Sequence, residues 1–125
     1  MDKVKNEMKK ADALRIQGWL ENIDSFNSTP EFGTTRVLFT PVELACREYV
    51  KQEMRTLGLT VTQDGAGNLF GTLEGMEPRL PPVWTGSHID TVPNAGMFDG
   101  MAGVVAGMEA VRLLQERGAT LRRSL

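Results

Sequence analysis

The chain has 125 residues, of which 41% are hydrophobic and 24% charged, and its formal net charge is -2. This length and composition are typical of one globular unit with a single core. A charge so close to zero does not attract nucleic acid or an anionic membrane surface, and no run approaches the roughly 18 uncharged apolar residues of a membrane span. We therefore expect a soluble protein with neither kind of partner.

Cysteine usage points to the compartment. Cys46 is the only cysteine, so an intrachain disulfide is excluded. Scarce cysteine fits a reducing environment, and the N-terminus lacks the apolar stretch of a secretory signal. We therefore expect the protein to be cytoplasmic.

The first predicted element is an amphipathic helix over residues 3–24, where apolar residues recur at mostly helical spacing among charged ones. Its apolar positions are Val4, Met8, Ala11, Ile16, Leu20 and Ile23. Turn-forming residues dominate positions 25–33 and predict a loop. Arg36 lies just beyond this loop, and the sequence leaves open whether it is structural or reaches a cleft.

A second helix is predicted to begin at Thr40-Pro-Val-Glu43, with Thr40 as N-cap, Pro41 at the first helical position and Glu43 completing a capping box. It should run to about Leu57 and end at Gly58 in a C-terminal cap. The residues expected to be buried are Val42, Cys46, Tyr49, Val50, Met54 and Leu57.

A hairpin is expected next, because residues 59–63 alternate with period two, 64–67 form a turn and 68–73 resume an extended pattern. Turn geometry explains Gly65 and Gly67 better than phosphate binding does, since no helix follows to hold a phosphate. After a proline-rich loop, residues 83–86 predict a short strand, and His88 and Asp90 follow directly after its end. Loops at the carboxyl ends of strands are common ligand sites.

A third helix is predicted from Met101 to about Arg117, ended by Gly118. One face holds Val104, Met108, Val111 and Leu114, and the opposite face holds Glu109, Arg112 and Glu116. Gly103 and Gly107 form a GxxxG pattern, which we attribute to close packing against a sheet rather than to helix dimerisation. Residues 121–125 have the pattern of the beginning of a further strand.

The only histidine of the chain, His88, is followed closely by Asp90 and Asp99 among glycines and a proline. An imidazole and a carboxylate brought together by a short turn suit a borderline divalent cation such as Zn²⁺ or Mn²⁺. Taken singly, His88 could be a hydrogen-bonded structural residue and Asp99 a helix N-cap. The strand end, the pair, the turn and the helix start converge on one place, which favours a metal site.

The metal site predicted here is incomplete. A catalytic metal usually takes about three protein ligands and a water, and two-metal hydrolases need more. One histidine and the nearby carboxylates do not supply them. We therefore expect the chain to be part of a larger protein.

The string Gly86-Ser-His88-Ile-Asp90-Thr-Val-Pro-Asn-x-Gly-x-x-Asp99-Gly100 resembles the metal motif of the M20-type metallohydrolases. The resemblance is to their amidase and carbamoylase branch, which includes allantoate amidohydrolases, ureidoglycolate hydrolases and N-carbamoyl-L-amino acid hydrolases. It extends to Gly33-Thr-Thr-Arg36, to Thr40-Pro41 and to residues 64–71. It implies an α/β fold with helices packed on a mixed sheet. Residues 1–125 would be the N-terminal portion of the catalytic domain, without the lid and dimerisation domain.

The resemblance also implies roles for three residues. His88 would be a ligand of one of two divalent ions, Asp99 a carboxylate that bridges both, and Asp90 the active-site residue that clamps the His88 ring. The ions would be Zn²⁺ or Mn²⁺, with Co²⁺ and Ni²⁺ also compatible. The dipeptidase and deacetylase branches have a long insertion between the two aspartates, whereas Asp99 follows Asp90 by nine positions here, which favours the amidase branch.

The implied activity is metal-dependent hydrolysis of carbon-nitrogen bonds in linear amides, with small ureido or N-carbamoyl substrates such as allantoate or N-carbamoyl amino acids. A Glu-Glu pair that the family uses as general base and ligand is absent from this chain, so the chain by itself should be inactive. Complete relatives are commonly homodimers. The alternatives are an M20-type dipeptidase or deacylase with a different pocket, and a non-catalytic remnant.

Overall fold

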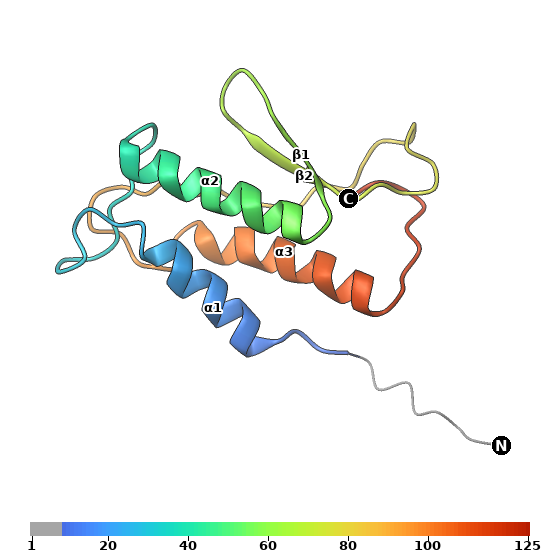
Figure 1. The fold of residues 1–125 in the computed structure, drawn as a ribbon, viewed down its shortest axis with the longest axis horizontal. Helices are drawn as coiled ribbons and strands as arrows, with labels where there is room; N and C mark the ends of the chain where they lie inside the picture. Colours follow the sequence, from blue (N-terminus) through green and yellow to red (C-terminus); the bar gives the residue numbers. More distant parts are fainter. Residues whose placement is uncertain (1–8) are drawn as a thin grey trace.

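The computed structural model describes residues 9–125. Their elements, in chain order, are α1 (Ala13–Asp24), α2 (Pro41–Thr56), β1 (Thr60–Gln63), β2 (Leu69–Thr72) and α3 (Met101–Glu116). Helix α1 lies against α3 and α2, and α2 packs on the hairpin of β1 and β2 (Figure 1). This combination of helices and sheet confirms the predicted α/β fold class, but the sheet of the described residues is the antiparallel pair of β1 and β2 and not the mixed sheet that the resemblance implied. No helix in the described part has the length and apolar character needed to cross a bilayer.

The core forms where the three helices meet and continues into the chain between α2 and β1. Its buried apolar residues are Trp19, Leu20, Ile23, Cys46, Val50, Leu57, Leu59, Met101, Val105, Met108 and Val111. Cys46 faces this core, as predicted, and its burial raises the pKa of the thiol to about 11. Cys46 is therefore a packing residue and not an exposed nucleophile.

Helix α1 begins ten residues later than the sequence pattern indicated, at Ala13. The Asp12 carboxylate accepts hydrogen bonds from the backbone amides of Leu14 and Arg15, which makes Asp12 the N-cap. The predicted helix is therefore wrong over residues 9–12. The part of the prediction over residues 1–8, with Val4 and Met8, lies outside the described residues.

The start of α2 is confirmed, with one change in its capping. The Thr40 hydroxyl accepts from the amide of Glu43 at 3.4 Å. The Glu43 carboxylate does not return to Thr40, but accepts from the Phe39 amide at 3.1 Å and from Arg47 at 2.6 Å. Glu43 is fully buried. Its charge is therefore compensated within the first turns of the helix, as a buried carboxylate requires.

The end of α2 and the hairpin follow the sequence prediction. Gly58, at φ 78°, follows the C-cap of α2. Strands β1 and β2 pair antiparallel, with Thr60 opposite Thr72 and Gln63 opposite Leu69. In the turn, Asp64 accepts hydrogen bonds from the side chain and backbone of Asn68, which lower the pKa of its carboxyl group. Gly65 and Gly67 thus belong to turn geometry.

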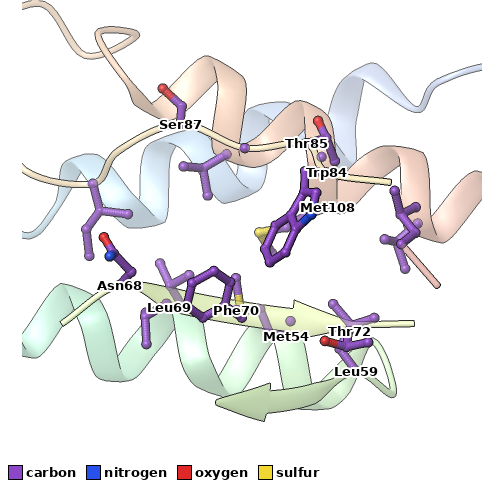
Figure 2. Close-up of a pocket in the computed structure, with 18 of the residues that line it drawn as sticks. Met54, Leu59, Asn68, Leu69, Phe70, Thr72, Trp84, Thr85, Ser87 and Met108 are labelled. Atoms are coloured by element: carbon purple, nitrogen blue, oxygen red, sulfur yellow. The ribbon is translucent and has the colours of Figure 1, made fainter. Parts of the chain in front are cut away.

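The predicted strand over residues 83–86 is wrong. Among the described residues, strand pairing is limited to β1 with β2 and one isolated bridge elsewhere. Segment 83–87 is separated from β2 by a groove of about 1040 Å³, across which Phe70 meets Trp84 edge-on with ring centroids 5.3 Å apart (Figure 2). A strand needs a neighbouring backbone to bond, and the groove prevents that contact.

Residues 121–125 do not form the predicted strand, but they hydrogen-bond to the chain beside the groove. Leu125 exchanges two backbone hydrogen bonds with Leu73, at 2.8 and 2.9 Å, and Ser124 accepts from the Val83 amide at 2.8 Å. The C-terminal residues thus join the end of β2 to the start of segment 83–87.

Glu109, predicted on the face of the third helix opposite its apolar residues, is not exposed to solvent. Glu109 is 3% exposed. Its carboxylate accepts from Arg15 Nε at 2.7 Å and Nη2 at 2.8 Å, and from the Asp12 amide at 2.8 Å. Helix α1 packs on this face of α3, so the carboxylate is both covered and paired.

Replacing Glu109 by glutamine is expected to reduce the acid sensitivity of folding. Burial acts to raise the pKa of Glu109, but the hydrogen bonds and charge of Arg15 outweigh it and lower that pKa below 4.5. The carboxylate therefore stabilises the fold above this pH, and its contribution is lost as pH falls through the lowered pKa. At pH 7 Glu109→Gln should lower the free energy of unfolding by about 2 kcal/mol.

This difference should shrink when urea unfolding of the full-length protein is repeated near pH 3. Glu31→Gln, which changes an exposed carboxylate, is the control. A gap between Glu109→Gln and wild type that stays constant across the pH range would show that the ion pair does not contribute to the acid response.

Candidate functional site

The loop of residues 88–100 leads from segment 83–87 to the start of α3. It is held at its middle by an isolated antiparallel bridge between Thr34 and Ala95, whose backbone amides and carbonyls exchange two bonds of 2.9 Å. Asn94, next to the bridge, adopts a positive φ of 55°, which asparagine tolerates better than most residues. The loop is therefore anchored by long-range contacts and returns to α3 beside its own beginning.

This return brings the three candidate residues together. His88 Nδ1 lies 2.8 Å from the backbone oxygen of Asp90 and 3.4 Å from its carboxylate. His88 Nε2 lies 3.9 Å from the Asp99 carboxylate. A proton on Nδ1, donated to Asp90, leaves the lone pair of Nε2 directed toward Asp99.

The contact between Asp90 and the imidazole differs in one respect from the expected one. The carboxylate was expected to hold the ring, because residues i and i+2 of an extended segment point to the same side. The nearer acceptor is the Asp90 carbonyl, since the chain turns directly after His88. The tautomer is therefore set first by the backbone and only then by the side chain.

Asp99 is not the cap of α3. The N-cap is Gly100, and no side chain caps the helix there. Gly100 has φ 73°, and a Cβ atom on it would lie 2.6 Å from two atoms of the His88 ring and 2.5 Å from the His88 carbonyl oxygen. The absence of a side chain at Gly100 therefore makes room for the imidazole beside Asp99.

The two glycines of the GxxxG pattern also serve the site. A Cβ at Gly103 would lie 2.7 Å from Ser87 Cβ, and one at Gly107 would lie 3.3 Å from a methyl group of Thr85. The predicted close packing exists, but the partner is the extended segment before His88 and not a paired sheet. The small residues on α3 thus set the depth at which His88 enters the site.

The donor set suits a divalent cation. Ligand atoms about 2.0 to 2.2 Å from a tetrahedral ion lie roughly 3.4 Å apart. The 3.9 Å between His88 Nε2 and Asp99 is wider than this by about half an ångström, a gap that a side-chain adjustment closes. Both side chains are more than half exposed and accessible to an ion. Within residues 9–125 no group of three potential ligands occurs.

The sequence analysis assigned no role to two residues of this region, Gly100 and Arg36. Gly100 lies against the His88 ring and adopts a positive φ. The only sequence feature that could have predicted this conformation is the presence of a glycine at the start of a helix. Arg36 is fully buried, and its Nε donates to the Ile89 carbonyl at 2.7 Å. The sequence feature that could have indicated a structural role for Arg36 is its position after a turn-rich loop, with no carboxylate at helical spacing to pair with it.

Comparison with known proteins shows close relatives. The chain is 44% identical over 114 residues to a ureidoglycolate hydrolase of Arabidopsis thaliana, covering 91% of this chain and 24% of that protein. It is 41% identical over 111 residues to an N-carbamoyl-L-amino-acid amidohydrolase of Paenarthrobacter aurescens, covering 89% of this chain and 27% of that protein.

A solved structure agrees with these relatives. The crystal structure of a hydantoinase/carbamoylase family amidase from Burkholderia ambifaria superposes with a TM-score of 0.90 at 35% identity, covering 95% of this chain and 29% of that one. No family model matches the chain. The chain thus spans about a quarter of the length of the curated relatives it matches.

Proposed function

We propose that this chain, which is homologous to part of the ureidoglycolate hydrolases and N-carbamoyl-amino-acid amidohydrolases, belongs to a metal-dependent hydrolase of linear carbon-nitrogen bonds. The substrates would be small ureido or N-carbamoyl compounds, such as allantoate or N-carbamoyl amino acids. The observation that supports this most directly is the approach of His88 Nε2 to Asp99 while Nδ1 is engaged by Asp90.

In this proposal His88 would hold a divalent cation through Nε2, and Asp99 would be the carboxylate shared between that cation and a second one. Asp90 would fix the ring by accepting a hydrogen bond from Nδ1–H, an arrangement that orients imidazole ligands in metal sites. The cations would be Zn²⁺ or Mn²⁺, and Co²⁺ or Ni²⁺ would also accept these donors. Such a cation lowers the pKa of water toward about 7 and polarises a carbonyl group.

The residues of this chain supply only part of the site. The other ligands and the group that accepts the proton of the attacking water would come from elsewhere in the full-length protein, because residues 9–125 hold no third ligand near His88 and Asp99. We place this chain in the N-terminal part of the catalytic domain, with a lid and dimerisation domain elsewhere in a homodimeric, cytoplasmic protein. Alone, the chain should be inactive.

The proposed function is tested with the full-length protein. The protein is stripped with a chelator, loaded with Mn²⁺ or Zn²⁺, and assayed for ammonia release from allantoate, ureidoglycolate and N-carbamoyl-L-amino acids. We expect hydrolysis of at least one of these compounds, and only after metal is restored. Preferential cleavage of dipeptides or N-acyl amino acids would instead identify a peptidase or deacylase. If the protein neither binds metal nor hydrolyses any of these compounds, it is non-catalytic.

Asp90→Ala is expected to weaken the metal site without abolishing it. The Asp90 carbonyl, at 2.8 Å from Nδ1, remains in the variant, whereas the carboxylate at 3.4 Å is lost. Removing such an outer partner of a ligand typically costs about 10- to 100-fold, and we expect a loss near the lower limit. The measurement is the Mn²⁺ concentration that gives half-maximal activity. Unchanged metal dependence would refute the clamp role of the carboxylate.

A further inference from the structure

Arg36 differs from the other well-buried arginine of the described part. Arg36 is 0% exposed, whereas Arg47, at 6%, pairs with the Glu43 carboxylate at 2.6 Å. The salt bridges between described residues do not include Arg36. A buried cation is costly unless its donors are satisfied. What Arg36 bonds to therefore indicates why it is there.

Within residues 9–125 the Arg36 guanidinium donates only to backbone carbonyls, through Nε and Nη1, and its buried Nη2 has no partner there. Nη1 donates to the carbonyls of Ile23, at 3.1 Å, and Phe26, at 2.8 Å, where α1 ends. Nε donates to the carbonyl of Ile89 at 2.7 Å. The side chain thus connects a fixed point at the end of α1 to the residue between His88 and Asp90.

The backbone of Arg36 holds the same loop on the other side of Asp90. The Arg36 amide donates to the Thr91 hydroxyl at 2.8 Å, and the Thr91 amide donates to the Arg36 carbonyl at 2.8 Å. The Thr91 hydroxyl donates in turn to the Thr34 carbonyl at 3.1 Å. The two neighbours of Asp90 in the chain, Ile89 and Thr91, are therefore both held by Arg36.

We propose that Arg36 is a positioning residue of the metal site, holding the peptide groups on both sides of Asp90 so that His88 Nε2 faces Asp99. This inference rests on the proposed function. The Asp90 carbonyl that engages His88 Nδ1 belongs to the same peptide group as the Thr91 amide, which donates to the Arg36 carbonyl, and the peptide group before it is held through the Ile89 carbonyl. Without the guanidinium, the Ile89 peptide is free to rotate, and both the ring orientation and the separation of the two ligands change.

The test measures Mn²⁺ binding to the full-length protein directly, by the loss of the free-ion electron paramagnetic resonance signal, alongside thermal unfolding. Arg36→Met removes the donors and keeps much of the volume. Arg15→Met is the matched control, because Arg15 also pairs with a buried group, Glu109, but far along α3 from the site. Thr91→Val removes the hydroxyl that accepts from the Arg36 amide and keeps the shape of the side chain.

We expect Arg36→Met to weaken Mn²⁺ binding by about 10- to 100-fold, the range typical of outer partners of a metal site. Thr91→Val should weaken it in the same direction, and Arg36→Lys, which keeps the charge and some donors, should recover part of the loss. Arg15→Met should lose thermal stability and bind Mn²⁺ within about twofold of wild type. If Arg36→Met does not fold, the Mn²⁺ affinities of Thr91→Val and Arg36→Lys test the inference instead.

Wild-type affinity in both Arg36→Met and Thr91→Val would overturn the inference, and so would an equal loss of affinity in Arg15→Met, because that loss would reflect stability alone. If Arg36→Met does not fold, wild-type affinity in Thr91→Val and Arg36→Lys overturns it equally. These outcomes leave the proposed function intact. Failure of the wild-type protein to bind any of Mn²⁺, Zn²⁺, Co²⁺ and Ni²⁺ would refute the proposed function itself, and the role of Arg36 with it.

Discussion

His88→Ala in the full-length protein is expected to lower kcat/KM for an N-carbamoyl amino acid by at least about 10³-fold, equivalent to roughly 4 kcal/mol of lost transition-state stabilisation. His88 offers the only imidazole of this chain, and its Nε2 is directed toward Asp99. Alanine removes that donor, so we expect a correspondingly lower content of bound metal. The measurements are kcat/KM with saturating Mn²⁺ and bound metal per chain by elemental analysis.

Asp99→Asn provides an independent view of the same centre. The amide keeps the size of the side chain but loses the negative charge that two cations would share, so metal content should fall here as well. Glu77→Gln, which alters an exposed carboxylate paired with Arg122, is the control and should retain activity. Full metal content and near-normal kinetics in both His88→Ala and Asp99→Asn would refute the metal site.

Gly100→Ala is expected to reduce activity by about 10²-fold or more, although Gly100 has no side chain to take part in the chemistry. The new Cβ would lie 2.6 Å from the His88 ring, so the imidazole must move. A displacement of about 1 Å at a reacting group is enough for such a loss. Alanine at φ 73° adds backbone strain of about 1 to 2 kcal/mol.

Gly118→Ala separates these two effects. Gly118 has a similar φ of 60° at the end of α3, but a Cβ there meets nothing within 4 Å. This variant should lose stability from backbone strain and keep its activity and its affinity for Mn²⁺. Equal losses of activity in Gly100→Ala and Gly118→Ala would attribute the effect to strain, and the contact of Gly100 with His88 would then have no functional meaning.

Where the deciding interactions are local, the sequence was sufficient. The start of α2 follows from a threonine hydroxyl and a proline within four residues, and the hairpin follows from alternation around an Asp64 turn. Gly58 and Gly118 end their helices through a conformation that glycine adopts at little cost. These elements could be predicted because their hydrogen bonds join residues close in the chain.

Where a distant partner decides, sequence patterns failed. Glu109 has the spacing of a solvent-facing residue, but Arg15 lies opposite it in the fold. Residues 83–86 have the composition of a strand, yet a groove separates them from β2. Hydrophobic periodicity predicts the buried face of a single helix or strand, but it does not predict which other element packs on that helix or strand.

The sequence by itself determined which potential metal ligands are present, namely one imidazole and two carboxylates at short spacing. It also determined the similarity to amidohydrolases that supports a metal-binding role for them. Only the tertiary structure decided how they meet. The loop is folded back by contacts between residues more than fifty positions apart, so that His88 Nε2 faces Asp99. These contacts are those of Arg36 with Ile89 and Thr91 and of Thr34 with Ala95. The physical reason is that a loop without its own secondary structure is positioned by what it bonds to elsewhere.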